Sequence, residues 1–209
     1  IFYSFTFWAP TMMIRTYGIS LSEVGFILGI ITIVSSITGT ILAGSAVDFL
    51  RNRNYSDAPV RAAMIAVLLA LPPVVLLSFV QSEFAAWACI ALYLLFISSF
   101  APLGLLAISG VSAGNVKGQL AAVHAFLMMA FGLSLGPQIT AFFTDFIFMD
   151  SNYLNWSVSL TGAIVLPISA YLFKITLPKY RESSERLKKI NLVRIKALSA
   201  ATSDNPKLP

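Results

Sequence analysis

Charged residues are scarce in this sequence, and their scarcity argues against a water-soluble fold. Only 11% of the 209 residues are Asp, Glu, Lys or Arg, while 57% are hydrophobic and the mean hydropathy is +0.83. A soluble domain of this length needs a polar surface, which so few charges cannot supply. The composition therefore predicts an integral membrane protein.

Cysteine and histidine are almost absent, each occurring once, as Cys89 and His124. One cysteine excludes an intramolecular disulfide framework and a cysteine-based metal cluster. A membrane-embedded enzyme would need paired histidines at metal spacing, or a Ser/His or Asp/Asp pair inside the membrane. No Asp or Glu falls in the middle of an apolar stretch, and no phosphate-binding glycine loop with its lysine occurs. We therefore expect neither an enzyme nor a cofactor or metal.

Long apolar stretches dominate what is present. A membrane helix needs about 20 mostly apolar residues, and continuous runs of this kind do not fit the short alternating strands of a β-barrel. The sequence thus predicts an all-α integral membrane bundle of six transmembrane helices over residues 1–178. The first stretch is short, and we expect this helix to be truncated at its N-terminus. The six stretches cover residues 1–14, 22–50, 60–80, 85–110, 118–148 and 156–177.

The basic residues are distributed unevenly between the two sides of such a bundle. Threading the stretches alternately through a bilayer places every Lys and Arg except Arg15 on one side. Cytoplasmic loops carry such an excess, which predicts a multi-pass protein of the cytoplasmic or plasma membrane with a cytoplasmic tail. The tail, residues 179–209, carries much of the net charge of +5. It is predicted to meet anionic lipid headgroups rather than nucleic acid, either as a surface helix or as a solvated segment.

Small residues line one face of the second stretch at intervals of about four residues. Such a face lets a neighbouring helix approach closely, either in fixed packing or at a sliding interface. Both this stretch and the fifth are rich in glycine and end on an acid. Such a similarity between corresponding spans is typical of the three-plus-three inverted repeats of transporters. The packing residues predicted from these two stretches are Gly25, Gly29, Thr40, Gly132, Gly136 and Pro137.

The small-residue face ends in Gly44 and Asp48, followed by Arg51 and Arg53. A carboxylate at the membrane edge beside two arginines predicts a charge latch, in which Asp48 pairs with one of them or faces a helix N-terminus. On the opposite side, Arg15 has three predicted roles: pairing with Glu23 at an external gate, binding an anionic substrate, or extending its charge to water at the end of the span.

This segment resembles the second-half copy of the cytoplasmic signature of the major facilitator superfamily, although Phe49 stands where the family places a basic residue. The segment from Phe7 through Gly18 to Gly25 is similar to the seventh span and following loop of these transporters. The segment from Lys117 through Pro137 to Asp145 is similar to their eleventh span. The nearest likeness is to the spinster-like branch.

The resemblance implies that the chain is the C-terminal half, spans seven to twelve, of a twelve-helix carrier whose N-terminal six-helix half is missing here. It also implies secondary active transport of a small organic solute or anion by alternating access, as a symporter, an antiporter or an uncoupled carrier. The spinster-like branch would favour an amphiphile. The alternatives are a six-span channel or a non-transporting scaffold in the lipid bilayer.

In that fold the first, second, fourth and fifth spans line a cavity near the midplane. Polarity and depth select the candidate substrate contacts, although hydroxyls of this kind also bond neighbouring helices or their own backbone. For His124 we expect one of two roles: either it takes part in proton coupling, or it is a neutral imidazole hydrogen-bonded to a backbone carbonyl. The ten candidates are Tyr3, Phe7, Trp8, Ser35, Ser36, Tyr93, Ser98, Ser99, His124 and Met128.

Overall fold

A computed structural model describes residues 1–114 and 116–203, with side chains described up to residue 193, and every regular element in this part is helical. The α-helices, in chain order, are α1 (Phe2–Tyr17), α2 (Leu21–Asn52), α3 (Ala58–Leu76), α4 (Glu83–Ile97), α5 (Phe100–Val111), α6 (Lys117–Phe142) and α7 (Leu154–Ser203). A π-helical turn, Phe143–Phe148, continues α6, and a short 3-10 turn, Ser151–Tyr153, precedes α7.

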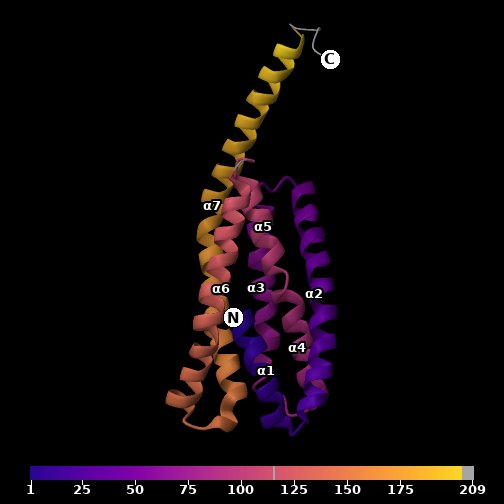
Figure 1. Cartoon of the computed structure of the whole chain (residues 1–209), viewed down its shortest axis with the longest axis vertical. Coiled ribbons are helices and arrows are strands. Elements are labelled where there is room, and N and C mark those ends of the chain that lie inside the picture. Colours follow the sequence, from indigo (N-terminus) through magenta and orange to yellow (C-terminus); the bar gives the residue numbers. More distant parts are fainter. Residues whose placement is uncertain (115, 204–209) are drawn as a thin grey trace.

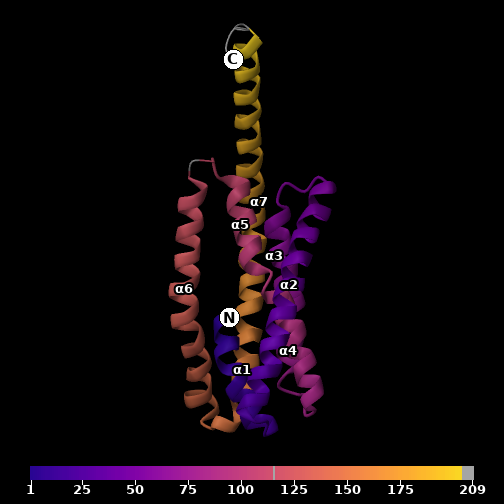
Figure 2. The same cartoon turned by 45° about the vertical axis from the view of Figure 1, so that its right-hand side comes forward.

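Five stretches of the described chain are long and apolar enough to cross a membrane: α2, α3, α4 with α5, α6 with its π turn, and α7. Helix α1 has 16 residues and lies within the same bundle (Figure 1). The prediction of an all-α membrane bundle with six helical segments is confirmed, and the arrangement is consistent with one half of a major facilitator fold. Helix α7 is 50 residues long and includes the first part of the basic segment that begins at residue 179; its first turns there contact the bundle through Tyr180 and Arg181, and its end projects beyond the bundle (Figures 1 and 2).

Local sequence signals determine the tight turn between α1 and α2. Gly18 ends α1 in the left-handed conformation, with φ of 69°, and its N–H donates to the carbonyl of Ile14 at 3.0 Å. Glycine adopts this conformation without steric cost. Ser20 then caps α2, because its hydroxyl accepts a hydrogen bond from the N–H of Glu23 at 3.3 Å. The two helices are therefore joined as an antiparallel pair.

The fourth span is broken into α4 and α5 at Ser98 and Ser99. Pro102 explains the break, since proline has no N–H to donate to the carbonyl four residues earlier and its ring clashes with that carbonyl. The break tilts α5 away from the axis of α4 (Figure 2). Both halves of this span contact α2 and α3, and α5 also packs against α6 and α7.

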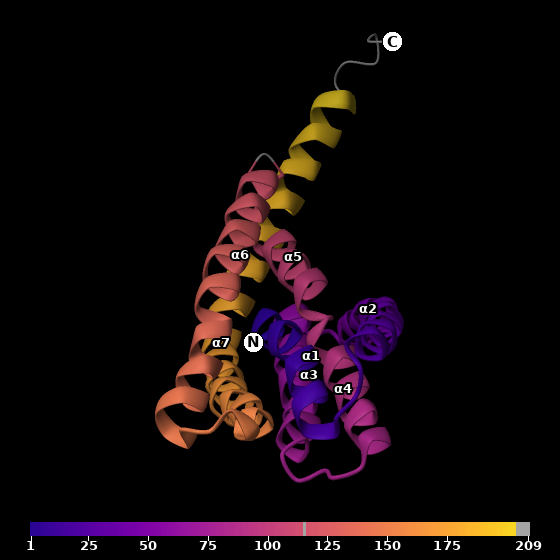
Figure 3. The ribbon, with the colours of Figure 1, turned by 60° about the horizontal axis from the view of Figure 1, so that its bottom comes forward.

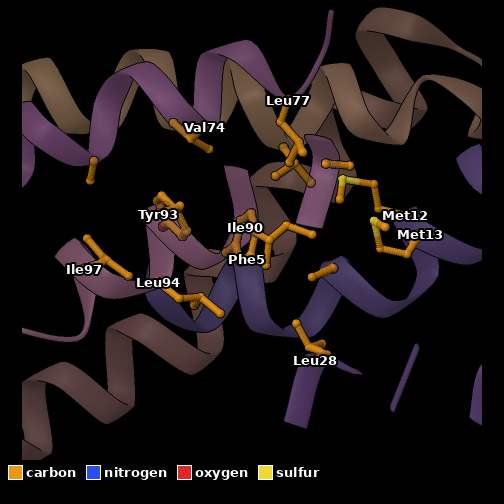
Figure 4. Close-up of a cluster of buried hydrophobic side chains, with 14 of the residues drawn as sticks. Phe5, Met12, Met13, Leu28, Val74, Leu77, Ile90, Tyr93, Leu94 and Ile97 are labelled. Carbon is orange, nitrogen blue, oxygen red and sulfur yellow. The ribbon is translucent and has the colours of Figure 1, made fainter. Parts of the chain in front are cut away.

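The helices form a bundle with α2 and α6 at opposite edges and α1, α3 and α4 between them (Figure 3). The buried apolar core lies where α1, α3 and α4 meet, and Tyr93 is its largest fully buried side chain. Phe5 and Tyr93 pack with their ring centroids 4.3 Å apart, and Val74 and Ile90 extend the cluster (Figure 4).

The ends of the bundle differ in charge, as the sequence predicts. We call the basic end the one formed by the C-terminus of α2, the α5–α6 connection and the extension of α7 (Figure 1). The opposite end holds the α1–α2, α3–α4 and α6–α7 connections and carries Arg15 together with Glu23, Glu83 and Asp150.

A chain of buried hydroxyls connects three helices near this opposite end. Ser4 of α1 lies 2.8 Å from Thr140 of α6, and Thr140 lies 3.0 Å from Thr161 of α7, each distance joining two hydroxyl oxygens. All three residues are buried. Because hydrocarbon offers no alternative partner, these bonds hold α1, α6 and α7 together.

Replacing Thr140 by Val is expected to lower the free energy of unfolding by about 1 kcal/mol, because Ser4 and Thr161 lose their shared partner while side-chain volume is kept. The measurement is equilibrium unfolding in mixed detergent micelles. Thr176→Val is the matched control, since the Thr176 hydroxyl is exposed and bonds only the Leu172 carbonyl of its own helix. Equal effects of the two substitutions would contradict the role assigned to the hydroxyl chain.

Candidate functional site

The main candidate site is a cavity of about 490 Å³ between α1 and α6. Its lining mixes aromatic, hydroxyl and amide groups, as substrate pockets commonly do. Phe7 is the most accessible aromatic group there, with 62% of its surface exposed. The lining residues are Tyr3, Thr6, Phe7, Leu133, Ser134, Pro137 and Gln138.

Small residues and hydrogen bonds fix the relative position of these two helices, among them the Ser4–Thr140 contact described above. A Cβ atom at Gly132 would lie 2.6 Å from the ring of Tyr3, and one at Gly136 would lie 3.3 Å from Ser4. The indole N–H of Trp8 donates to the carbonyl of Pro137 at 2.9 Å. The predicted small residues of the fifth span thus lie at a helix interface, and Trp8 bonds the backbone of α6.

The small residues of α2 are placed differently from those of α6. A Cβ atom added at Gly25, Gly29 or Gly44 would meet no atom of the described chain within 4 Å, and Thr40 is exposed. The glycine of α2 that touches a neighbour is Gly39, which packs against the carbonyl of Leu95. The predicted stripe therefore faces away from the helices of this chain.

The predicted hydroxyl contacts on α2, α4 and the α4–α5 break mostly bond the protein itself. Ser35 donates to the carbonyl of Ala91 at 3.1 Å, Ser98 lies 3.3 Å from the carbonyls of Ser35 and Leu95, and Ser99 bonds the carbonyl of Phe96. Their hydroxyls are thereby occupied within the fold.

The remaining cavity candidates do not share one site. Tyr93 is fully buried in the core, and its hydroxyl has no hydrogen-bond partner among the described residues. His124 lines a second cavity with α5 and α7, where its Nε2 is enclosed beside Gly104 and likewise has no partner within the described chain. Ser36 and Met128 are half-buried. The ten candidates therefore remain predictions, of which Tyr3 and Phe7 share the α1–α6 cavity with Trp8 beside it.

Sequence reasoning missed three polar residues that line the α1–α6 cavity: Thr6, Ser134 and Gln138. Gln138 carried a usable signal, because an amide one residue after Pro137 and well inside an apolar stretch is costly in a bilayer. Thr6 and Ser134 are common membrane-helix residues and gave none.

The predicted charge contacts are not formed in this structure. Asp48, Arg15 and Glu23 are exposed, and none of them takes part in an ion pair between described side chains. Arg53 instead lies over the ring of Phe49, with its guanidinium carbon 4.4 Å from the centroid. Arg51 lines a polar cavity at the basic end. The proposed latch and gate thus have no paired partner in this conformation.

An ion-pair cluster centred on Asp57, which the sequence did not single out, occupies the basic end. Asp57 precedes the first residue of α3 and is only 1% exposed. Its carboxylate accepts a hydrogen bond from Arg61 at 3.0 Å and one from Arg181 of α7 at 3.2 Å. Ser56 donates to Glu185 at 3.3 Å beside it. The cluster joins the start of α3 to the extension of α7.

The two arginines determine the protonation of this carboxyl group. Burial alone would raise the pKa of Asp57, but the Arg61 hydrogen bonds and the charges of Arg61 and Arg181 outweigh it and lower the pKa below its ordinary value of 3.8. Asp57 is therefore ionised at neutral pH and contributes a structural contact between two helices.

Comparison with known proteins finds distant relatives among transporters. The chain is 25% identical over 175 residues to an uncharacterized transporter, YybO, of Bacillus subtilis (strain 168), covering 78% of this chain and 38% of the relative. It is 26% identical over 184 residues to an MFS-type efflux pump of Mycolicibacterium smegmatis, covering 86% of this chain and 42% of the relative. No family model matches the chain.

The chain spans about two fifths of the length of these curated relatives. It is thus distantly similar to transporters, one of them of the MFS type, and neither relative is named as an enzyme. With its long apolar helices, the chain is an integral multi-pass membrane protein.

Asp57→Asn is expected to lower the free energy of unfolding by about 1 to 3 kcal/mol, because it removes the charge shared by two arginines. The value stays below that of a fully buried pair, since Arg181 keeps 49% of its side chain exposed. Asp48→Asn is the matched control, with an expected change within about 0.5 kcal/mol. Equilibrium unfolding of both variants in the same detergent decides the matter, and an equal loss in both would refute the role given to Asp57.

Stability is also expected to depend on pH through this carboxyl group. A lowered folded-state pKa means that the stabilisation is fully present above the ordinary value of 3.8 and is lost as the pH falls through the lower folded-state pKa. Unfolding measured from neutral to acidic pH should therefore show a loss of stability below about pH 4 that is smaller in Asp57→Asn. If Asp57→Asn lost as much unfolding free energy at acidic pH as the wild-type protein, the result would contradict the ion pair.

Proposed function

We propose that this chain forms one six-helix half of a secondary transporter of the major facilitator type, which moves a small organic solute or anion by alternating access. The observation that carries the proposal is the cavity between α1 and α6, which is open and lined by both aromatic and polar groups. The distant similarity to an MFS-type efflux pump supports it.

The uncovered faces of α2 and α6 support the presence of a second half. Only 6% of the apolar window of α6 and 22% of that of α2 are buried inside the chain. On α2 the uncovered face includes Gly25, Gly29 and Gly44, which would let another helix approach closely. In this proposal the remaining length of the protein supplies the other six helices, and the relatives are long enough to contain them.

Substrate would then bind between the halves near the midplane. On this side of the site, Phe7 and Tyr3 would supply aromatic surface, and Gln138 and Ser134 would supply hydrogen bonds. The basic end would face the cytoplasm, because Lys and Arg concentrate there. Asp48 and Arg51, unpaired in this conformation, would pair when the cytoplasmic side closes.

A channel is the main alternative, and the two hypotheses differ in access. Alternating access exposes the same site to each side of the membrane in turn, without a continuous aqueous pathway. A channel instead conducts continuously when open.

The test uses single cysteines introduced into the full-length protein with Cys89 replaced by Ser. Phe7→Cys is expected to react with a membrane-impermeant maleimide from either side of oriented vesicles, because it lines the substrate cavity. Tyr171→Cys, on α7, is the matched control: Tyr171 is 64% exposed and Phe7 is 62% exposed in this chain. It is expected to react at least about tenfold more slowly, because α7 would face lipid.

Planar bilayer recording completes the comparison, and the protein is expected to show no unitary currents. Unitary conductance would favour the channel. If the Phe7→Cys and Tyr171→Cys variants reacted equally slowly, the face of Phe7 would not be aqueous and the proposed cavity would be wrong.

A further inference from the structure

Two cavities of opposite character lie next to each other at the basic end. The polar one has a volume of about 360 Å³ and lies among the end of α2, the α2–α3 connection, α5 and α7, with Arg51, Tyr180 and Lys188 in its wall. The apolar one has a volume of about 500 Å³ and lies among α5, α6 and α7, with Phe100, Ile108 and Tyr180 in its wall. Both volumes are in the range typical of ligand sites.

Tyr180 lines both cavities and stands between them. It is buried, and its hydroxyl donates to the carbonyl of Ala107 in α5 at 3.0 Å. Gly110, one turn further along α5, contacts this hydroxyl closely and leaves the space that the ring needs. The tyrosine is therefore held in place at the level where α7 leaves its apolar segment, so the polar cavity lies toward water and the apolar one toward the membrane interior.

The charges around the polar cavity favour an anion. Arg51 and Lys188 line it, while of the neighbouring acids Asp57 is compensated by Arg61 and Arg181, and Glu185 keeps its charge and accepts a hydrogen bond from Ser56. Basic pockets between membrane helices on the cytoplasmic side bind the head groups of anionic lipids. A phosphate oxygen would gain charge-assisted hydrogen bonds there.

The apolar cavity is suited to a hydrocarbon chain. Its wall is formed by aliphatic and aromatic side chains, among them Leu172 and Phe173. His124 also lines this cavity, with its Nε2 enclosed against Gly104 rather than facing the open space.

We propose that the two cavities form one site for an anionic phospholipid, with its phosphate between Arg51 and Lys188 and an acyl chain between α5, α6 and α7. The lipid is a resident ligand, distinct from a transported substrate in the α1–α6 cavity. The proposal requires the chain to lie in a bilayer and does not depend on transport.

The test is native mass spectrometry of the full-length protein in detergent with equimolar dioleoyl phosphatidylglycerol and dioleoyl phosphatidylcholine. Wild-type protein is expected to retain phosphatidylglycerol preferentially. The double variant Arg51→Gln/Lys188→Gln should lower this preference about tenfold, given the attraction expected for two cationic groups. The matched control Arg53→Gln/Lys189→Gln removes the same charges from the same helices at positions that line neither cavity, and should keep the preference.

A second variant tests the hydrocarbon part of the site. Thr176→Trp fills the apolar cavity from an exposed position of α7 and should weaken phosphatidylglycerol binding without lowering the melting temperature. An equal loss in the control double variant would mean diffuse charge attraction and would overturn the proposal. Two other outcomes would also overturn the proposal, because the site would then bind only an anion. One is displacement of the lipid by inorganic phosphate at a concentration equal to that of the lipid, and the other is undiminished phosphatidylglycerol binding to Thr176→Trp.

Discussion

Hydrocarbon cannot hydrogen-bond, and this constraint determines where the polar groups of the chain lie. Most hydroxyls inside the bundle bond carbonyls or one another, as Ser35 does to Ala91 and Thr140 does to Ser4, whereas the buried hydroxyls of Tyr93 and Ser159 have no partner in the described chain. Charged groups are confined to the two ends, where water or a partner is available. Asp57 marks the limit of this rule, because it is buried at the boundary and two arginines compensate its charge. The constraint also keeps α2 and α6 helical although little of either is covered within the chain.

The same solvent removes the hydrophobic drive for helices to associate, so close packing depends on small residues and shape. The contacts at Gly39, Gly132 and Gly162 bring a helix against a backbone or a bulky side chain. Faces without such contacts, including the one with Gly25 and Gly29, remain open to lipid or to other helices. Exposed apolar side chains are therefore not a defect of this fold, because lipid can cover them. They support the presence of a second helical half only in combination with the α1–α6 cavity and the length of the relatives.

Hydropathy predicted the helical segments well, because a span needs about 20 apolar residues and this length appears directly in the sequence. The choice of packing face could not be predicted in the same way. Gly39 and Gly29 are both glycines of α2, and only the position of α4 decides that Gly39 is the one in contact. Asp57 was overlooked in favour of Asp48 for a related reason. Its partner Arg61 is one helical turn away and could have been noticed, but Arg181 is 124 residues distant and only the fold brings it near.

These contacts also determine which helices are joined to one another. Helices α3 and α7 are joined along the bundle, with Gly162 against Val74, and again at the basic end through Asp57, so they behave as one unit. Helix α6 is held to α1 by Trp8 and Thr140 and to α7 by Thr140, and nearer the basic end it packs against α5, where Gly104 leaves room for the ring of His124. These contacts join α6 to α1, α5 and α7, although only 6% of its apolar window is buried within the chain. The uncovered face of α6 is therefore the surface on which lipid or a further helix would pack.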